Sequence, residues 1–376
     1  MAHSKDLTVG ILLSYKESVD VMKKVGQYAR FLEYYIKPYS ESFKKVYVFG
    51  WAQEEHQFPF DNVVFVPNRR GINSYLYNYL MPFVEADKLR ECQVLRLMQL
   101  TPAIPGMISQ LLFRNKLYCN YGFVYARNLA VQNKKLKRLI WLVLEKVAFW
   151  RMDMIAAAHT GIVEYLQEKK VPEKKIRIIE NGVDVDWFKP VLREGDAESQ
   201  KLNLLFVGRF EVEKNLFSLT EALNRSKYKD RFKLTLVGSG SEETQLVELF
   251  QKYKIEYEIV KNIPHKELVS YYQAADIFLL VSLTEGYPKV LIEAMACGLP
   301  SIVSRYKFHK ILAHDNVNCL TCEIEAESIC EKLDTMVGDK ELRTRLGKAA
   351  REWVETKNNI RTIIQSEIGL ITSLVK

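Results

Sequence analysis

Short runs of β-branched and aromatic residues alternate with amphipathic stretches along the chain, and this alternation starts twice. The pattern favours βαβ units with a parallel sheet in each half. In the first half we expect strands at Leu7–Leu13, Lys45–Phe49, Val63–Val66, Gln93–Leu97, Leu117–Tyr121, Met154–Ala157 and Ile176–Ile179, and helices at Val21–Tyr35, Ser74–Val84 and Ile140–Trp150. In the second half we expect strands at Asn203–Val207, Lys233–Val237, Tyr257–Val260, Ile277–Val281 and Ser301–Val303, and helices near 216–224, 242–252, 266–274, 290–296 and 340–356. The predicted fold class is α/β, with two Rossmann-like doubly wound sheets.

The polar stretch 191–200 separates the two halves and is typical of a linker. We therefore expect an N-terminal domain over 1–190 and a C-terminal domain over 201–356. Apolar residues at near-helical spacing predict a further helix over 357–376. Two such sheets joined by a linker leave a cleft at their facing strand ends, and open α/β sheets bind ligands outside the carboxyl ends of their strands.

The composition excludes several classes of protein. With 48% hydrophobic and 27% charged residues over 376 positions, the chain is too apolar to be disordered. Its longest clean apolar run, Leu139–Leu144, is far short of a membrane span, and Val9–Leu13 is too short for a signal peptide. We expect a cytoplasmic protein unless it associates with a membrane surface. The six cysteines are expected to be reduced, since the lone pair Cys319 and Cys322 lacks the second pair that zinc would need.

The net charge of +8 is concentrated in one segment. Residues 1–190 carry a net +9, and Arg114–Arg151 alone holds nine basic residues against one acidic residue, Glu145. Such a field attracts nucleic acid, anionic lipid or a charged acceptor, although a solvated helix face is the alternative. No nucleic-acid motif accompanies the charge, so we expect no nucleic-acid partner.

The same segment has features of a helix that lies in a membrane interface. Basic residues precede the apolar run, and aromatic residues lie within or after it; they are Lys134, Lys135, Lys137, Arg138, Trp141, Phe149 and Trp150. Tryptophan and basic residues anchor such helices. The alternative is a helix packed on the N-terminal sheet.

Two motifs of the second half suggest phosphate binding. The strand ending at Gly208 leads into a turn with Arg209 and Lys214, where a helix N-terminus adds amide donors for a pyrophosphate. The strand 233–237 runs into Gly238-Ser-Gly240, half of a dinucleotide fingerprint that lacks its third glycine. Solvated loop cations and a tight strand-to-helix turn are the respective alternatives.

The third motif runs from Val281 to Pro300. Gly286 allows a sharp turn, and Pro288 sits before a helix that would open with the amides of Lys289 and Val290. Two carboxylates, Glu285 and Glu293, would repel a phosphate ligand unless they bind sugar hydroxyls. This arrangement favours a ligand that carries both phosphate and hydroxyl groups.

These motifs together resemble the signature of retaining glycosyltransferases of the GT-B fold, specifically glycosyltransferase family 4. The resemblance includes Glu285-x7-Glu293 with the run to Pro300, Val207-Gly-Arg209 with Lys214, Glu180-Asn-Gly-Val-Asp184 and Tyr271-Tyr-Gln-Ala-Ala-Asp276. It is strong over about residues 176–356, and the N-terminal half matches in general layout.

The resemblance implies a role for each matching residue. Arg209 and Lys214 would neutralise the donor diphosphate, Glu285 would contact the transferred sugar, and Glu293 would bind the ribose. The remaining implied donor contacts come from three loops; they are Gly238, Ile263 within 261–264 near the base, and Gly286, Tyr287, Pro288, Lys289 and Val290.

The resemblance also implies front-face substitution with retention and no metal cofactor, with Arg209, Lys214 and Glu285 as catalytic residues. The donor would be a nucleotide-diphosphate hexose and the acceptor a hydroxyl, on a membrane-presented glycolipid or a growing glycan. A C-terminal helix would cross back to the N-terminal domain.

The N-terminal half departs from the family pattern at two loops. The first loop contains Tyr15 where members have a glycine pair, and Tyr121-Gly122 stands where members have His-Gly. We take Tyr15, Tyr121 and Gly122 as acceptor-side residues, although tyrosine is a poor base at neutral pH. Asp184 and Asp186 mimic a metal motif but lie in the expected inter-domain turn.

Two other functions are open alternatives. One is a non-catalytic subunit that binds sugar nucleotides, and the other is a sugar-nucleotide epimerase or phosphorylase on the same fold. Arg209 and Glu293 are expected to line the site rather than a core, so alanine at either position should abolish donor use and leave the fold intact.

Overall fold

The computed structural model describes residues 4–24, 26–126, 135–191, 201–261, 263–307 and 309–375. It divides into two compact units, residues 1–180 with 361–376, and residues 181–360. Most of the expected linker, residues 192–200, lies outside the described residues, as do Arg127 and Lys134 of the basic segment.

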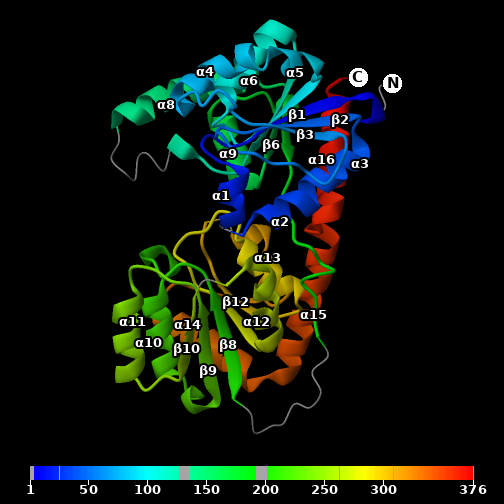
Figure 1. Ribbon diagram of the computed structural model, residues 1–376. Coiled ribbons are helices and arrows are strands. Elements are labelled where there is room, and N and C mark those ends of the chain that lie inside the picture. The colour runs from blue at the N-terminus through cyan, green and yellow to red at the C-terminus, as the bar shows by residue number, and fades with distance from the viewer. Residues whose placement is uncertain are drawn as a thin grey trace. The chain divides into compact units, whose positions relative to one another are not determined.

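The N-terminal unit is built on a seven-stranded parallel sheet of order β3-β2-β1-β4-β5-β6-β7 (Figure 1). Its strands are β1 Thr8–Leu12, β2 Lys45–Phe49, β3 Val63–Val66, β4 Val94–Met98, β5 Lys116–Tyr121, β6 Met154–Ala157 and β7 Ile176–Ile178. Its helices are α1 Val19–Lys24, α2 Tyr28–Phe31, α3 Lys37–Ser42, α4 Ser74–Val84, α5 Ala86–Glu91, α6 Ala103–Phe113, α8 Lys135–Arg151, α9 Thr160–Glu168 and α16 Ile360–Ser373. The expected helix Val21–Tyr35 is wrong as one element, because Gly26 at φ 71° separates α1 from α2 and a π-helical turn, Leu32–Ile36, follows.

A buried ion pair connects the C-terminal helix α16 to this sheet. Arg96 on β4 donates from Nε to Oε1 of Glu367 at 2.7 Å, and the two side chains are only 3% and 1% exposed. Ile364, Ile368 and Ile371 of α16 are buried as well. Residues 361–376 therefore belong to the N-terminal unit.

The C-terminal unit has a six-stranded parallel sheet of order β10-β9-β8-β11-β12-β13. Its strands are β8 Leu202–Val207, β9 Phe232–Val237, β10 Tyr257–Val260, β11 Ile277–Leu280, β12 Ser301–Ser304 and β13 Leu320–Cys322. Its helices are α10 Leu216–Arg225, α11 Glu243–Lys252, α12 Leu268–Ala274, α13 Lys289–Ala296, α14 Ala326–Gly338 and α15 Lys340–Lys357. Leu204 and Phe206 face one core and Leu205 and Val207 the other, because side chains alternate along a strand. The expectation of two doubly wound parallel sheets is confirmed.

Two glycines of the predicted phosphate motif are required by packing between neighbouring loops. A Cβ atom at Gly238 would overlap the carbonyl oxygen of Gly208, and one at Gly240 would overlap that of Phe210. The Gly-Ser-Gly turn after β9 thus lets the loop after β8 approach backbone to backbone.

Candidate functional site

The predicted donor residues follow adjacent strands at one edge of the C-terminal sheet. Its order reverses between β8 and β11, since β8, β9 and β10 progress one way and β11, β12 and β13 the other. Ligands of doubly wound sheets bind at such a switch point, outside the carboxyl ends of the strands. Arg209 and Lys214 follow β8, and Glu285 follows β11.

An ion pair bridges this switch point. Nζ of Lys214 lies 2.6 Å from Oε1 of Glu285, with side chains 17% and 12% exposed. Ser282 donates to the same oxygen at 2.7 Å, and the amide of Leu283 donates to the carbonyl of Glu213. Two loops about 70 residues apart in sequence are thereby held together with a cation and a carboxylate side by side.

Arg209 is placed differently from Lys214. Its side chain is 73% exposed and pairs with Glu213 at 2.7 Å. Exposed pairs of this kind contribute little free energy, so the guanidinium can leave Glu213 for a bound anion at small cost.

Glu293 is buried. The expectation that it lines the site and does not belong to a core is therefore wrong. Glu293 is 4% exposed on α13. Its Oε1 lies 2.8 Å from Nε2 of His265, and its Oε2 accepts a hydrogen bond from the Tyr272 hydroxyl at 3.0 Å. Burial and the adjacent Glu293 carboxylate raise the pKa of Tyr272 well above its usual value. Alanine at Glu293 would leave this buried hydroxyl unpaired, so we expect such a variant to be less stable than the wild type.

The loop from Gly286 to Val290 leads into α13. Tyr287 is buried and its hydroxyl bonds to Asn358, whereas Gly286 is exposed. The carbonyl of Pro288 accepts from the amides of Leu291 and Ile292. Lys289 is the first residue of α13, and the positive end of the helix dipole lies there, at the carboxyl edge of β11.

The loop after β10 holds the residue that is predicted to contact the base. Ile263 is half-buried and packs against the core that contains Tyr272. Asn262, within the expected segment 261–264, lies outside the described residues.

Two of the three acceptor-side residues lie at the carboxyl edge of the N-terminal sheet. The Tyr15 amide donates to Oγ1 of Thr101 at 2.9 Å, and the Gly122 amide donates to Oε1 of Gln99 at 3.2 Å. The Tyr15 hydroxyl is buried without a hydrogen-bond partner among the described residues. Tyr15 therefore carries an unused polar group at the switch point between β1 and β4.

Tyr121 does not fit the expected acceptor contact, because it belongs to the core. It is 1% exposed, and its hydroxyl donates to Oε1 of Glu145 at 2.9 Å. Trp141 donates to the same oxygen and Tyr165 to the other carboxylate oxygen. The indole nitrogen of Trp141 is thus bound within the N-terminal unit.

The aspartates that mimic a metal motif shape a turn. Oδ1 of Asp184 accepts from the amides of Asp186 and Trp187. No group of three or more histidine, cysteine, aspartate or glutamate side chains suited to a metal occurs in the part of the chain that the structure describes. Cys319 and Cys322 are buried, and burial raises the pKa of each thiol to about 12.

Three further residues lie near the site but were not assigned to it from the sequence: His265, Tyr272 and Tyr306. The Tyr306 hydroxyl, just after β12, is buried and unpaired among the described residues, and burial together with the charge of Glu285 raises its pKa. Tyr272 lies within a motif that carried the resemblance, so its position gave a signal. His265 and Tyr306 gave none, because their neighbours are set by tertiary packing.

Comparison with known families identifies the family of the C-terminal unit, which holds this candidate site. The sequence model described as glycosyl transferases group 1 matches residues 190–353, somewhat less than half of the chain. The C-terminal unit is a glycosyl transferases group 1 domain. The family resemblance found in the sequence is thereby confirmed.

Two relatives and one solved structure illustrate the likeness. The chain is 27% identical over 54% of its length to N-acetyl-alpha-D-glucosaminyl L-malate synthase of Bacillus anthracis. It is 29% identical over 59% of its length to the UDP-Gal:alpha-D-GlcNAc-diphosphoundecaprenol alpha-1,3-galactosyltransferase of Escherichia coli. The matches span 55% and 60% of those two proteins. The structure of Anabaena HepE in complex with UDP superimposes with a TM-score of 0.72 at 15% identity, over 98% of this chain and 100% of that one. This last likeness is one of fold, and it confirms the expected GT-B fold.

Proposed function

We propose that this protein is a retaining glycosyltransferase that moves a hexose from a nucleotide-diphosphate sugar to a hydroxyl acceptor on a membrane-presented glycan. The Lys214–Glu285 pair across the switch point carries the proposal, because a cation of the kind that binds phosphate lies beside a carboxylate of the kind that binds hydroxyls. Two names support the donor class, since one relative is named for UDP-Gal and one structure of the same fold was solved with UDP. The diphosphoundecaprenol in the former name supports the acceptor class.

The proposed reaction needs no nucleophile from the protein. The bond between the anomeric carbon and the diphosphate oxygen breaks, and the acceptor oxygen bonds to the same face of that carbon. The acceptor proton passes to the departing phosphate. Lys214 and Arg209 stabilise the charge that develops on this phosphate, and preorganised charges of this kind supply much of the rate enhancement of enzymes. Glu285 orients the sugar through its hydroxyls.

A panel of nucleotide sugars tests this proposal. A donor that binds the folded protein raises its melting temperature, and the donor so identified is then incubated with lipid-linked and soluble glycan acceptors. We expect one donor to stabilise the protein and an α-linked product to form from an α-linked donor. A donor that binds without any product would indicate the non-catalytic subunit instead. An inverted product would overturn the retaining mechanism.

Glu293→Gln and Glu293→Ala are expected to differ in stability although both weaken donor use. Glutamine keeps an acceptor for the Tyr272 hydroxyl, whereas alanine leaves that buried group unpaired at a cost of about 1–3 kcal/mol. Loss of the charged acceptor should raise the donor KM by roughly 10–100-fold in both variants. Thermal melts and donor titrations measure the two effects separately. Equal melting temperatures would show that Tyr272 does not depend on Glu293.

We predict that EDTA leaves the transfer rate unchanged. Lys214 and Arg209 are proposed to supply the positive charge that a metal supplies elsewhere, and Asp184 is occupied by backbone amides. Initial rates with and without chelator measure this. A large loss that Mn²⁺ restores would instead assign a metal to Asp184 and Asp186.

A further inference from the structure

Exposed apolar side chains are concentrated on three helices of the N-terminal unit. Of the 23 large hydrophobic residues that are exposed in the described part of the chain, 13 lie on α4, α6 and α8. They are Tyr75, Leu76, Tyr79, Leu80, Phe83, Leu111, Leu112, Leu136, Leu139, Ile140, Val143, Val147 and Trp150. Scattered single residues of this kind need no explanation, but a contiguous group indicates an interaction surface.

On α8 these residues form a single stripe. Leu136, Leu139, Ile140, Val143, Val147 and Trp150 recur at helical spacing and are 45–73% exposed. Glu145, Ala148 and Phe149 occupy the opposite, buried side. Helix α8 therefore packs on its unit through one face and presents a second apolar face outward.

Helix α4 has the same organisation, although it lies outside the basic segment. Tyr77, Asn78, Met81 and Pro82 are buried. Tyr75, Leu76, Tyr79, Leu80 and Phe83, on the other side, are 42–66% exposed. Nothing in its charge pattern marked this helix as a surface element.

The three helices lie side by side on one face of the sheet (Figure 1). Helix α6 contacts both α4 and α8. The right-handed crossovers from β4 to β5 and from β5 to β6 place α6 and α8 on the same face. The exposed residues of α4, α6 and α8 therefore form one surface, here termed the α4–α8 face.

The charges on the three helices themselves are almost entirely positive, and all of them lie on α8. Glu145 is the single acidic residue within the three helices, and it is buried and hydrogen-bonded. By helical spacing, Lys135 and Lys146 flank the α8 stripe on one side and Lys137 on the other.

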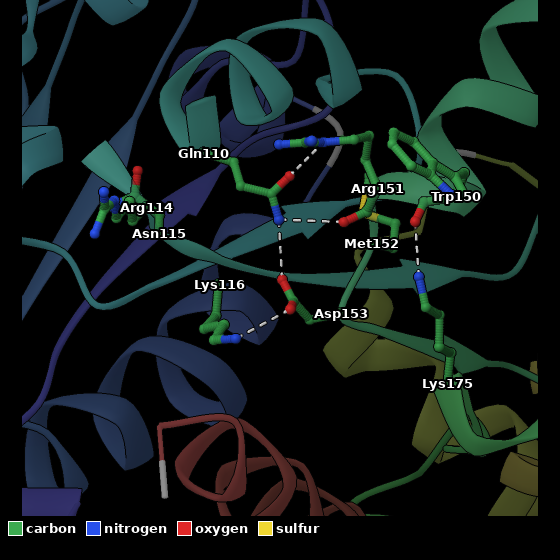
Figure 2. Close-up of a pocket in the computed structure, with 9 residues that line it drawn as sticks. All are labelled: Gln110, Arg114, Asn115, Lys116, Trp150, Arg151, Met152, Asp153 and Lys175. Carbon is green, nitrogen blue, oxygen red and sulfur yellow. Dashed lines mark hydrogen bonds and ion pairs between the residues drawn. The ribbon is translucent and has the colours of Figure 1, made fainter. Parts of the chain in front are cut away.

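A cationic pocket adjoins the C-terminal ends of α6 and α8 (Figure 2). Arg114, Lys116, Arg151 and Lys175 line it with Trp150, the last residue of the α8 stripe, against one acidic residue, Asp153. The Asp153 carboxylate accepts hydrogen bonds from Nζ of Lys116 at 3.3 Å and from Nε2 of Gln110 at 3.1 Å. Positive charge thus continues from the flank of α8 to the end of its apolar stripe.

We infer that the α4–α8 face inserts into an anionic lipid bilayer, with α4 and α8 both immersed at the level of the headgroups. The apolar stripe of α8, flanked by cations, is the pattern of a helix that binds a membrane interface, and α4 extends its apolar surface. The inference rests on the proposed function in one respect: a membrane-presented acceptor explains why the protein would bind a membrane. It goes beyond the electrostatic attraction of the basic segment by adding a second helix, α4, and the insertion of apolar side chains. Every helix in the described part of the chain is too short or too polar to cross a bilayer.

Charge favours the bilayer over a second copy of the chain. A two-fold contact would oppose the same cationic flanks to one another, with no exposed carboxylate on the three helices to compensate them. Anionic lipid headgroups complement these flanks, at about 1 kcal/mol for each cation near the surface.

Vesicle sedimentation of full-length variants tests the inference. The α4 variant carries Leu76→Ser, Leu80→Ser and Phe83→Ser, which change no charge and lie on an exposed surface. A matched control carries Ile178→Ser and Val317→Ser, which are 48% and 56% exposed elsewhere. Phosphatidylglycerol-containing vesicles are used at low salt and at roughly 0.5 M salt, where the Debye length falls to about 4 Å.

The wild type and the control should keep part of their binding at high salt, because apolar insertion is not screened. The α4 variant should bind at least about tenfold more weakly at high salt, since it loses buried apolar area. A reversal variant with glutamate at Lys135, Lys137, Arg138 and Lys146 should lose low-salt binding. The donor-induced thermal shift should be the same in all of them. Vesicle binding without any donor shift would reject the proposed function and keep this inference.

Two results would overturn the inference. One is an α4 variant that binds vesicles as the wild type does at both salt concentrations. The other is a wild type that ignores vesicles but self-associates in sedimentation velocity, with the α4 variant monomeric, which would make the face a contact between copies.

Discussion

Lys214→Met is expected to lower the rate of sugar transfer by about 10²–10³-fold, the cost of removing one preorganised group that stabilises transition-state charge. Methionine keeps most of the aliphatic stem of Lys214, which is 17% exposed, so packing changes little. Glu285 keeps its hydrogen bond from Ser282 and therefore its position. The effect should appear mainly in kcat, because charge on the leaving diphosphate develops as the bond breaks. Steady-state kinetics with the donor identified in the thermal-shift panel measure it.

Lys201→Met is the matched control for this prediction. Lys201 pairs with Glu256 at 2.7 Å, nearly the same distance, but at the amino end of β8 and with both side chains about half exposed. Loss of that pair should change neither kcat nor KM. If Lys214→Met transfers sugar at the rate of the Lys201 variant, the switch-point pair has no part in the reaction.

The sheets of both units could be predicted closely from the sequence because most of their strands are buried on both faces. Such strands read as continuous apolar runs, and the predicted limits of Lys45–Phe49, Val63–Val66 and Met154–Ala157 match β2, β3 and β6. Strand β13, Leu320–Cys322, was missed because three residues are too few for a recognisable run. The break at Gly26 was missed because apolar spacing continues across it.

The sequence predicts where the candidate site residues lie in the fold better than it predicts their burial and hydrogen-bond partners. The motifs place Lys214 and Glu285 at strand ends, and parallel sheets bring adjacent strand ends together, so their proximity follows from topology. The burial of Glu293 does not follow from any local pattern, since it depends on His265 and Tyr272 from another loop and helix. Tyr121 was misassigned for the same reason. Its hydroxyl donates a hydrogen bond to Glu145, which lies 24 positions away and is not connected to Tyr121 by any motif.

Glu367→Leu is expected to destabilise the N-terminal unit by about 3–5 kcal/mol, because it leaves the guanidinium of Arg96 buried without a counter-charge. For a unit of this size the loss corresponds to a fall in melting temperature of roughly 10 °C. Deletion of the residues after Asn358 removes the same carboxylate together with the buried Ile364, Ile368 and Ile371, and should give insoluble protein. Circular dichroism melts and soluble yield measure the two effects.

The double variant Arg96→Met with Glu367→Leu separates the ion pair from simple packing. Replacing both partners by apolar residues removes the uncompensated charge, and such replacements are often neutral or stabilising. We therefore expect the double variant to melt close to the wild type although each change alone is harmful. The exposed pair Lys37–Glu33 provides the control, since Glu33→Gln should cost no more than about 0.5 kcal/mol. If the double variant is as unstable as Glu367→Leu, the carboxylate of Glu367 serves more than Arg96. The connection of α16 to the sheet would then depend on its other neighbours.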